Sequence, residues 1–493
     1  MNRSAIVPVL ALLASLPLGL AGCATNPATG KSNVVMSSMS GERERVRSMH
    51  EEIVRALGLY EDQAIQDYIN ELGQRVARVS HLPGEEYRFY VIDDPGMNAF
   101  TTGCCNVYVN RGLLVNLNSE AEIISVLGHE IGHITARHPA RRQTRGVLAS
   151  LGTVAATILT GSNAVGQLAN LGAAAWVQGY GRDNEMEADR LGLEYSARAG
   201  YEPEAMQRTF EVFKAGERFE RDRARLEGRE PRIYHGIFSS HPTPDARVIQ
   251  AAKGAANVTT EPAGGWRINR EEYLQRIDGI AYGSSKAQGI VRDNRFYHAD
   301  LGITMAFPRG WTVDNERSRL LAYTPNKDAI MQVIADARPE KQGPREFLLE
   351  KLRGNSLVGG EVVSSNGNDG YSVLTRGGSP LDNGAGPVRW TVIYHGKNAY
   401  VIAGASKASA NGRPEADGLI TSVAETLRSL KPSEFPLAEP YRLKMVKANA
   451  ETQLASYVKD IPEDKYQRET LELINGLYPN KPLAPGQLFK TVQ

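Results

Sequence analysis

The stretch SEAEIISVLGHEIGHITARH, residues 119–138, determines how the rest of this chain is interpreted. It holds the motif His-Glu-x-x-His at residues 129–133, within apolar residues at helical spacing. At about 100° per residue, His129 and His133 share one face of a helix, so both imidazoles can bind one metal ion. The opposite face carries the apolar residues Ile124, Leu127, Ile131 and Ile134. We therefore predict a helix that holds a metal on one side and packs into a core on the other.

A capping box predicts where this helix begins. Ser119 is followed three residues later by Glu122, the pattern in which two side chains satisfy the first backbone N–H groups of a helix. The predicted start lies about three turns before the metal site, which is long enough to anchor it in a core.

A second helix is predicted in GRDNEMEADRLGLEYSARAGYEP, residues 181–203, because helix-start residues stand near its beginning and Gly200 near its end. Glu185 and Asp189 are four residues apart and therefore share a face. A catalytic zinc takes three protein ligands, and His-His-Glu is a standard set, so Glu185 is expected to complete the site. Asp189 is expected to accept a hydrogen bond from the second ring nitrogen of one of the histidines.

Glu130 follows the first histidine directly and is expected to reach the water on the metal rather than the metal itself. It would take a proton from that water and pass it to the leaving nitrogen of a cleaved amide. These residues predict one Zn²⁺ per chain and hydrolysis of peptide bonds.

The near-equal numbers of basic and acidic residues exclude a partner that is bound through a large net charge of the whole protein. Lys and Arg number 57 and Asp and Glu number 56 among 493 residues. No global field therefore favours nucleic acid, and any electrostatic specificity must be local. At this length we expect two to four domains.

Residues 1–22 have the features of a secretory signal peptide, with an apolar run over residues 5–20 that is too short for a membrane span. The following Leu-Ala-Gly-Cys resembles the lipobox of bacterial lipoproteins, which implies export and lipidation of Cys23. Ala24 after it resembles the outer-membrane sorting pattern of Gram-negative cells. We expect a lipoprotein at the periplasmic face of the outer membrane, tethered by residues 23–40.

Short strands are predicted directly before the metal helix. Residues 90–92 and 107–109 have strand-like composition, with a turn signal between them. An edge strand at this place can align a peptide substrate by strand addition, which makes Asn98, Ala99 and Phe100 candidate substrate-binding residues. An ordinary buried hairpin is an equal alternative.

The three cysteines are not spaced as a thiolate zinc site requires. Cys104 and Cys105 are neighbours, and a disulfide between them would close a small ring in an oxidising compartment. We expect free, partly buried thiols instead. A nucleophilic role is disfavoured because the sequence supplies no base for it.

Together the motifs resemble the gluzincin metalloproteases of the CAAX prenyl endopeptidase, HtpX and BepA type. The resemblance rests on His-Glu-Ile-Gly-His at 129–133, Glu-Met-Glu-Ala-Asp at 185–189, Asn-Ala-Phe at 98–100, Tyr-Val at 108–109 and Arg-Gly-Leu-Leu at 111–114. It covers about residues 40–255 and implies a zinc endopeptidase in which Glu185, not Glu187, is the third ligand. Residues 101–105 depart from the family's Pro-Gly-Gly, which leaves the shape of the substrate strand open.

The segment SSHPTPDARV, residues 239–248, is similar to the Ser/Thr-x-His-Pro element of that family. The resemblance implies two alternative roles for His241: it stabilises the oxyanion, or it occupies the zinc as a self-inhibiting fourth ligand. Arg247 resembles the arginine paired with this element. From chemistry alone, His241 is a loop histidine before a proline.

We predict an α+β fold for the chain, with a mainly helical first domain. A helical hairpin over residues 147–177 either covers the site, touches a membrane or partner, or belongs to the core. The mainly helical, zincin-like domain with its short edge-strand sheet is assigned to residues 41–285.

Two smaller parts follow. Residues 286–432 alternate strand and helix patterns in a smaller α/β sandwich, and Phe-Pro-Arg-Gly-Trp at 307–311 resembles PsbP-like domains. This accessory domain either binds a partner or substrate or is passive. Residues 433–493 resemble a degenerate LysM module, which implies peptidoglycan binding, although the usual Gly-Asp-Thr is missing.

Three functions follow from these patterns. The first is a lipid-anchored zinc endopeptidase of the bacterial cell envelope that acts on unfolded or misassembled envelope proteins, with outer-membrane assembly machinery or peptidoglycan as further partners. The second is a non-proteolytic assembly factor or peptidoglycan-binding scaffold with an autoinhibited zinc site. The third, with less weight, is a zinc amidase acting on peptidoglycan.

Overall fold

The computed structural model describes residues 22–30, 32–35, 38–144, 180–231, 245–381, 383–460 and 465–493. The signal peptide up to residue 21, the hairpin predicted at 147–177 and His241 lie outside these residues. The chain divides into two compact units: unit 1 is Met1–Ile280 with Leu443–Asp460 and Tyr466–Gln493, and unit 2 is Ala281–Arg442 with Ile461–Lys465. Helices and sheets occur in both units, which confirms the α+β class.

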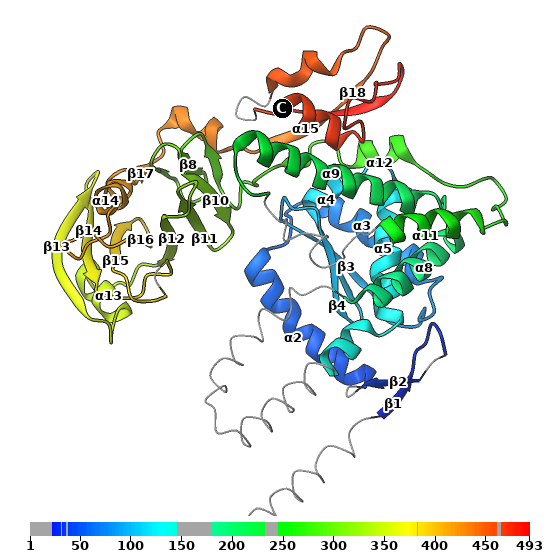
Figure 1. Ribbon diagram of the computed structural model, residues 1–493, viewed down its shortest axis with the longest axis horizontal. Coiled ribbons are helices and arrows are strands. Elements are labelled where there is room, and N and C mark those ends of the chain that lie inside the picture. Colours follow the sequence, from blue (N-terminus) through cyan, green and yellow to red (C-terminus); the bar gives the residue numbers. More distant parts are fainter. Residues whose placement is uncertain are drawn as a thin grey trace, which may run out of the picture. The chain divides into compact units, whose positions relative to one another are not determined.

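Unit 1 is mainly helical (Figure 1). Its helices are α2 (Met39–Leu57), α3 (Gln63–Ala77), α4 (Arg111–Asn116), α5 (Glu120–Thr135), α8 (Arg182–Arg198), α9 (Ala205–Glu227), α11 (Asp245–Ala256), α12 (Arg270–Arg276), η2 (Leu454–Asp460) and α15 (Gln467–Ile474). Its strands are β1 (Gly22–Thr25) paired with β2 (Ser32–Val35), the sheet of β3 (Arg88–Ile92), β4 (Ala99–Gly103) and β5 (Asn106–Asn110), and β19 (Leu488–Val492). The tether predicted at residues 23–40 thus includes a two-stranded ribbon and the first residues of α2.

Helix α5 forms the centre of unit 1, where it packs against α3, α8, α9 and β4 (Figure 1). All sixteen of its residues are buried, so the metal-binding face is as enclosed as the apolar face. The predicted cap is confirmed, because the Ser119 hydroxyl accepts a hydrogen bond from the Glu122 amide at 3.3 Å. The Glu122 carboxylate, however, accepts from the amide of Asn118 at 2.6 Å rather than from Ser119.

The three-stranded sheet before α5 places β4 at an edge. Strand β5 lies in the middle, parallel to β3 and antiparallel to β4. Tyr90, Tyr108 and Phe100 stand opposite one another in the register, one on each strand, and their rings stack in a row. This row holds β4 to the rest of the sheet through side chains as well as backbone bonds.

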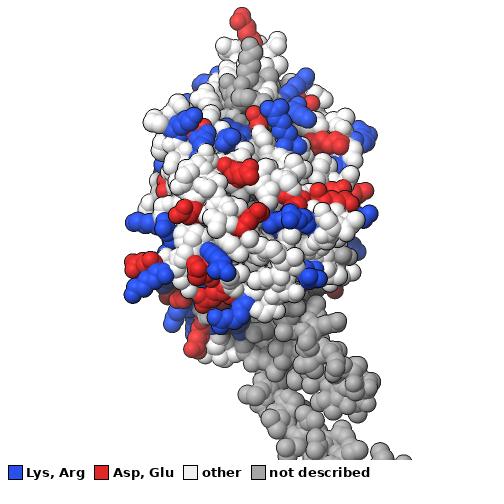
Figure 2. Space-filling model, turned by 90° about the vertical axis from the view of Figure 1, so that its left-hand side faces the viewer, with Lys and Arg blue, Asp and Glu red and all other residues white. Residues whose placement is uncertain are grey.

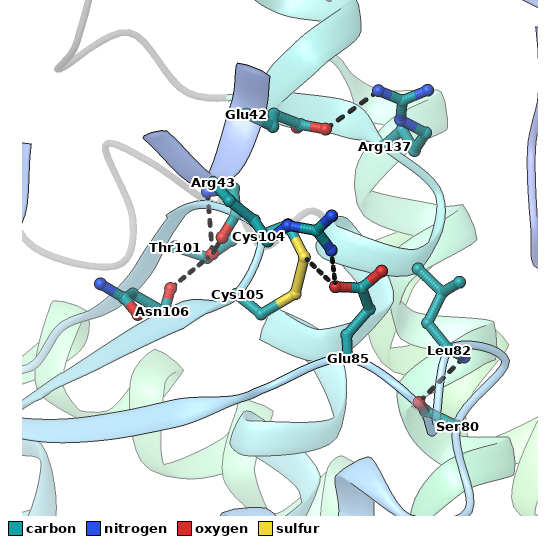
Figure 3. The surroundings of a disulfide bond; sticks show 11 residues. Glu42, Arg43, Ser80, Leu82, Glu85, Thr101, Cys104, Cys105, Asn106 and Arg137 are labelled. Atoms are coloured by element: carbon teal, nitrogen blue, oxygen red, sulfur yellow. Dashed lines mark hydrogen bonds and ion pairs between the residues drawn. A yellow bond between two sulfur atoms is a disulfide. The ribbon is translucent and has the colours of Figure 1, made fainter. Parts of the chain in front are cut away.

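Cys104 and Cys105 form a disulfide in the turn between β4 and β5 (Figure 3). The expectation of free thiols is wrong, because the turn brings the two sulfur atoms within bonding distance. Arg43 of α2 and Glu85 lie next to this turn and form an ion pair of 2.6 Å. The disulfide therefore belongs to the hairpin that contains the edge strand β4.

The C-terminal segment is part of unit 1. From Leu443 onward, β18 (Tyr441–Lys447) pairs antiparallel with β19. The fully buried Lys490 of β19 donates from Nζ to the carbonyls of Val115 and Leu117, both at 2.7 Å, at the end of α4 and just before α5. The predicted division at residue 433 therefore differs from the units of the structure, because these side chains are buried against the segment that leads into α5.

Unit 2 contains a seven-stranded antiparallel sheet in the order β10-β11-β12-β16-β15-β14-β13 and a four-stranded sheet in the order β17-β9-β8-β7. The strands are β6 (Ala281–Tyr282), β7 (Ile290–Arg292), β8 (Arg295–His298), β9 (Ile303–Ala306), β10 (Thr312–Glu316), β11 (Arg319–Tyr323), β12 (Ala329–Ala337), β13 (Leu357–Ser365), β14 (Asn368–Thr375), β15 (Val388–His395), β16 (Asn398–Ser406) and β17 (Arg428–Ser429). The helices are α13 (Pro344–Lys351), α14 (Asp417–Glu425) and η1 (Pro432–Ala438).

The seven-stranded sheet has a core on each face, as period-two alternation requires. Tyr400 and Ile402 of β16 pack with Ile420 of α14, whereas Val401 between them packs with Leu348 of α13. The two helices therefore cover opposite faces, and unit 2 is a layered sandwich.

Two surface properties bear on the partners of this chain. Figure 2 shows a face on which Lys and Arg are interspersed with Asp and Glu, without a large area of one sign. No described helix is both long enough and apolar enough to cross a bilayer.

Candidate metal centre

Small residues bring α5 and α8 into close contact. Gly128 and Gly132 on α5 face Gly192 and Ala188 on α8, each pair being one helical turn apart. A Cβ atom at Gly192 would lie 2.7 Å from the backbone nitrogen of His129, and one at Gly132 would lie 2.9 Å from the carbonyl of Ala188. The two backbones touch, so the acidic residues of α8 reach the histidines of α5.

His129, His133 and Glu185 converge at this contact. Their donor atoms lie within 4.8 Å of one another, and all three residues are buried. The two Nε2 atoms are 3.0 Å apart, and each is 3.5 Å from a different oxygen of Glu185. In a tetrahedral zinc site with bonds of 2.0–2.1 Å, neighbouring donor atoms are about 3.4 Å apart. The donor set and its spacing therefore fit zinc.

Asp189 and Arg247 support this centre from one side. Asp189 lies 2.9 Å from Nδ1 of His129, and Arg247 donates two hydrogen bonds of 2.6 Å to its carboxylate. Nη1 of the same arginine lies 2.9 Å from Glu185. Arg247 thus contacts both Glu185, a candidate metal ligand, and Asp189, the carboxylate next to the other candidate ligand His129.

Asp189 and Arg247 stabilise each other in their charged forms. Burial alone would raise the pKa of Asp189, but hydrogen bonds from Arg247 and His129 outweigh it and place the pKa below its ordinary value. Burial alone would lower the pKa of Arg247, but Asp189 and Glu185 keep it above its ordinary value. Both groups are therefore ionised near neutral pH.

His133 has a different set of neighbours. Its Nδ1 lies 2.8 Å from Nδ1 of His138, whose Nε2 lies 3.0 Å from Glu187. Burial lowers the pKa of His138 below its ordinary value, although Glu187 opposes this, while the hydrogen bond from His138 helps to lower the pKa of Glu187. The ring of Tyr180 stacks on His133, with centroids 4.0 Å apart.

The other predicted site residues lie as follows. Glu130 is fully buried on α5, and its charge affects the pKa of both Tyr180 and Arg247, which places its carboxylate near the metal centre. Ala99 and Phe100 are on the edge strand β4, and the Asn98 carbonyl accepts from the amide of Asn110 on the opposite strand. The backbone of Cys23 lies in β1, far along the chain from these residues.

Sequence reasoning missed two groups of residues. The small residues of the helix contact, Gly128 and Gly132 on α5 and Ala188 and Gly192 on α8, were not singled out, although the spacing of four residues on each helix could have indicated a close contact. His138 and Glu187 were missed because His138 lies beyond the end of α5, so no helical periodicity connects it to His133.

Replacing Gly192 with alanine is expected to weaken zinc binding at least about tenfold, because the new methyl group would push α8 and its ligand away from α5. Zinc affinity measured by competition with a chelating dye tests this. Gly181 before the same helix has open space at its Cβ position, so Gly181→Ala is the matched control and should bind zinc normally. Equal affinities of the two variants would contradict the role given to the glycine contact.

Comparison with known proteins finds a family match for this region. Residues 63–255 match the model of peptidase family M48. This range includes the three candidate metal donors and also Glu130, Asp189 and Arg247. The match agrees with the resemblance that the motifs carry over this part of the chain.

Several curated proteins are similar over the same region. The chain is 29% identical over 237 residues to the "Beta-barrel assembly-enhancing protease" of Yersinia pestis, which covers 46% of each chain. It is 30% identical over 206 residues to the protein of that name from Escherichia coli K12, with 40% of each chain covered. The "Mitochondrial metalloendopeptidase OMA1" of Arabidopsis thaliana is 32% identical over 152 residues, covering 31% of this chain and 30% of the relative. The chain thus spans less than half the length of these relatives.

A solved structure is similar to part of the chain. The solution structure of cyanobacterial PsbP from Synechocystis sp. PCC 6803 covers 29% of this chain and 96% of its own, at 14% identity. The TM-score of 0.22 is too low for this likeness to bear on function.

Proposed function

We propose that this chain, which carries a peptidase family M48 domain over residues 63–255, is a zinc-dependent endopeptidase of the bacterial cell envelope. The observation that carries the proposal is the convergence of two imidazole nitrogens and one carboxylate at spacings that fit zinc. The described residues provide three donors at this point, the number that a catalytic zinc takes from a protein.

The chemistry requires a Lewis acid and a base. Zinc bound there would polarise the scissile carbonyl and lower the pKa of a water molecule toward about 7. Glu130, next to the ligand His129, accepts the proton of the attacking water and delivers it to the leaving nitrogen. Arg247 and Asp189 keep His129 and Glu185 in place during this cycle.

An extended substrate fits the edge of β4. Because the Asn98 carbonyl bonds to β5, alternation in an antiparallel pair directs the backbone N–H and C=O of Ala99 to the opposite edge. In the described residues no other strand pairs with that edge, and β4 packs beside α5. A peptide added there as a strand would run past the metal donors.

Replacing Ala99 with proline is expected to lower kcat/KM for peptide substrates about tenfold, because proline lacks the N–H that would bond to the substrate. The β4–β5 bonds do not involve this N–H, but Ala99 is fully buried, so circular dichroism must show that the proline variant folds before its activity is compared. Ala99→Gly retains the N–H and is the matched control. Peptide cleavage kinetics, with zinc content checked for each variant, would contradict the substrate strand if Ala99→Pro cleaved as well as Ala99→Gly.

The substrate class is inferred from the relatives, and the location is inferred from the N-terminal sequence. The relatives named for β-barrel assembly suggest unfolded or misassembled outer-membrane proteins as substrates. The lipobox-like sequence at Cys23 supports anchoring to the periplasmic face of the outer membrane.

The experiment that tests the function is mass spectrometry of products from denatured envelope proteins, with and without chelator. Cleavage within polypeptides that stops on chelation and returns with zinc supports the proposal. A protein that binds zinc but leaves every polypeptide intact would contradict it and favour the scaffold function.

A further inference from the structure

Two side chains beside the metal donors, the buried His138 and the partly exposed Glu187, have no part in the proposed chemistry. His138 is fully buried and lies between His133 and Glu187, 2.8 Å from the first and 3.0 Å from the second. The three side chains form a chain of hydrogen bonds from His133 on α5, through His138 after the end of that helix, to Glu187 on α8. Such a chain determines which nitrogen of each ring carries its proton.

Zinc binding determines which nitrogen of His133 carries the proton. His133 can bind zinc through Nε2 only if that nitrogen has a free lone pair, so its proton must be on Nδ1. The Nδ1 proton needs an acceptor, which the geometry assigns to Nδ1 of His138. A neutral His138 then carries its own proton on Nε2, where the Glu187 carboxylate accepts it.

The arrangement parallels the one around the other histidine. His129 is oriented by a carboxylate directly, through the 2.9 Å contact of its Nδ1 with Asp189. His133 reaches a carboxylate through one intervening imidazole. In zinc proteins, a hydrogen-bond partner of this kind holds a ligand imidazole in one tautomer and one orientation.

Other neighbours hold Glu187 in its accepting position. Arg141 lies 3.6 Å from the oxygen that faces His138, and the Asn26 amide donates to the other oxygen at 3.4 Å. A cation and an amide donor both favour the ionised carboxylate. Glu187 is therefore available as an acceptor rather than a donor.

We propose that His138 and Glu187 are positioning residues that keep the proton of His133 on Nδ1 and so direct its Nε2 lone pair to the metal. This inference rests on the proposed zinc site. It predicts that loss of either residue weakens zinc binding although neither residue touches the metal.

The test compares zinc affinity, measured by dye competition, in His138→Leu, His138→Gln and Glu187→Ala. His138→Leu and Glu187→Ala should weaken binding about 10- to 100-fold. His138→Gln should regain part of this loss, because its amide oxygen can accept the His133 proton while its size resembles that of leucine. Glu194→Ala removes a similarly accessible carboxylate of the same helix that pairs with Arg198, so it is the control for Glu187→Ala and should bind zinc normally.

A second readout separates positioning from a general structural role. Nitrogen-15 NMR of the zinc-loaded protein should show His133 protonated on Nδ1 and His138 on Nε2, with His138 partly protonated on Nδ1 in Glu187→Ala. Equal losses in the leucine and glutamine variants, or unchanged tautomers in Glu187→Ala, would overturn the inference. If His138→Leu fails to fold, Glu187→Ala decides. Failure of the wild type to bind zinc would instead overturn the proposed function.

Discussion

Replacing Glu130 with glutamine is expected to reduce peptide cleavage by about 10²- to 10⁴-fold while leaving zinc bound. The amide has nearly the same size as the carboxylate but cannot accept the proton of the attacking water. The metal donors His129, His133 and Glu185 are unchanged, so metal affinity should be retained. Cleavage of an unfolded protein, measured together with the zinc content of each preparation, checks both parts of this expectation.

Two further variants make the result specific. Glu185→Gln removes a metal donor and should lose zinc and activity together. Ser125→Ala changes a buried residue of the same helix whose hydroxyl contacts Thr209, and it should retain both. Full cleavage by a zinc-loaded Glu130→Gln protein would remove Glu130 from the mechanism.

Ending the chain at Ala484 is expected to destabilise unit 1 strongly. The shortened protein lacks β19, in which Phe489 and Val492 are fully buried. Burial of two such side chains stabilises a fold by about 3–6 kcal/mol, which is a large part of the 5–15 kcal/mol typical of a whole protein. Urea unfolding followed by circular dichroism, together with zinc content, measures the loss.

The point variant Lys490→Met tests the polar part of this contact. It leaves the carbonyls of Val115 and Leu117 without their donor, at a cost of about 1–3 kcal/mol for each unsatisfied group. Lys444→Met, at an exposed position of the neighbouring strand, is the control and should change stability by less than about 0.5 kcal/mol. A shortened chain that unfolds at the same urea concentration as the full chain would show that the C-terminal segment is an independent module.

The sequence predicted those parts of the fold whose signals are local. In unit 2, strand-like composition at residues 303–311, 329–337, 371–377, 389–396 and 399–405 corresponds to β9, β12, β14, β15 and β16. Helical spacing at residues 344–352 and 418–430 corresponds to α13 and α14. Strands β6, β7, β8, β10, β11, β13 and β17 were not predicted. Most of β13 is exposed at the edge of its sheet, so it does not need the apolar alternation by which a strand is recognised.

The same distinction holds for the metal centre. By itself the sequence determined the helix of residues 119–135, its cap, and the residue types that can bind zinc, because spacing along one helix and capping depend on neighbouring residues. Only the tertiary structure decided which side chains contact the two histidines: Asp189 lies next to His129, and His138 links His133 to Glu187. It also decided that the two cysteines are bonded and that Lys490 contacts the backbone just before α5. These contacts join residues through packing, and no periodicity along the chain encodes which side chains will meet.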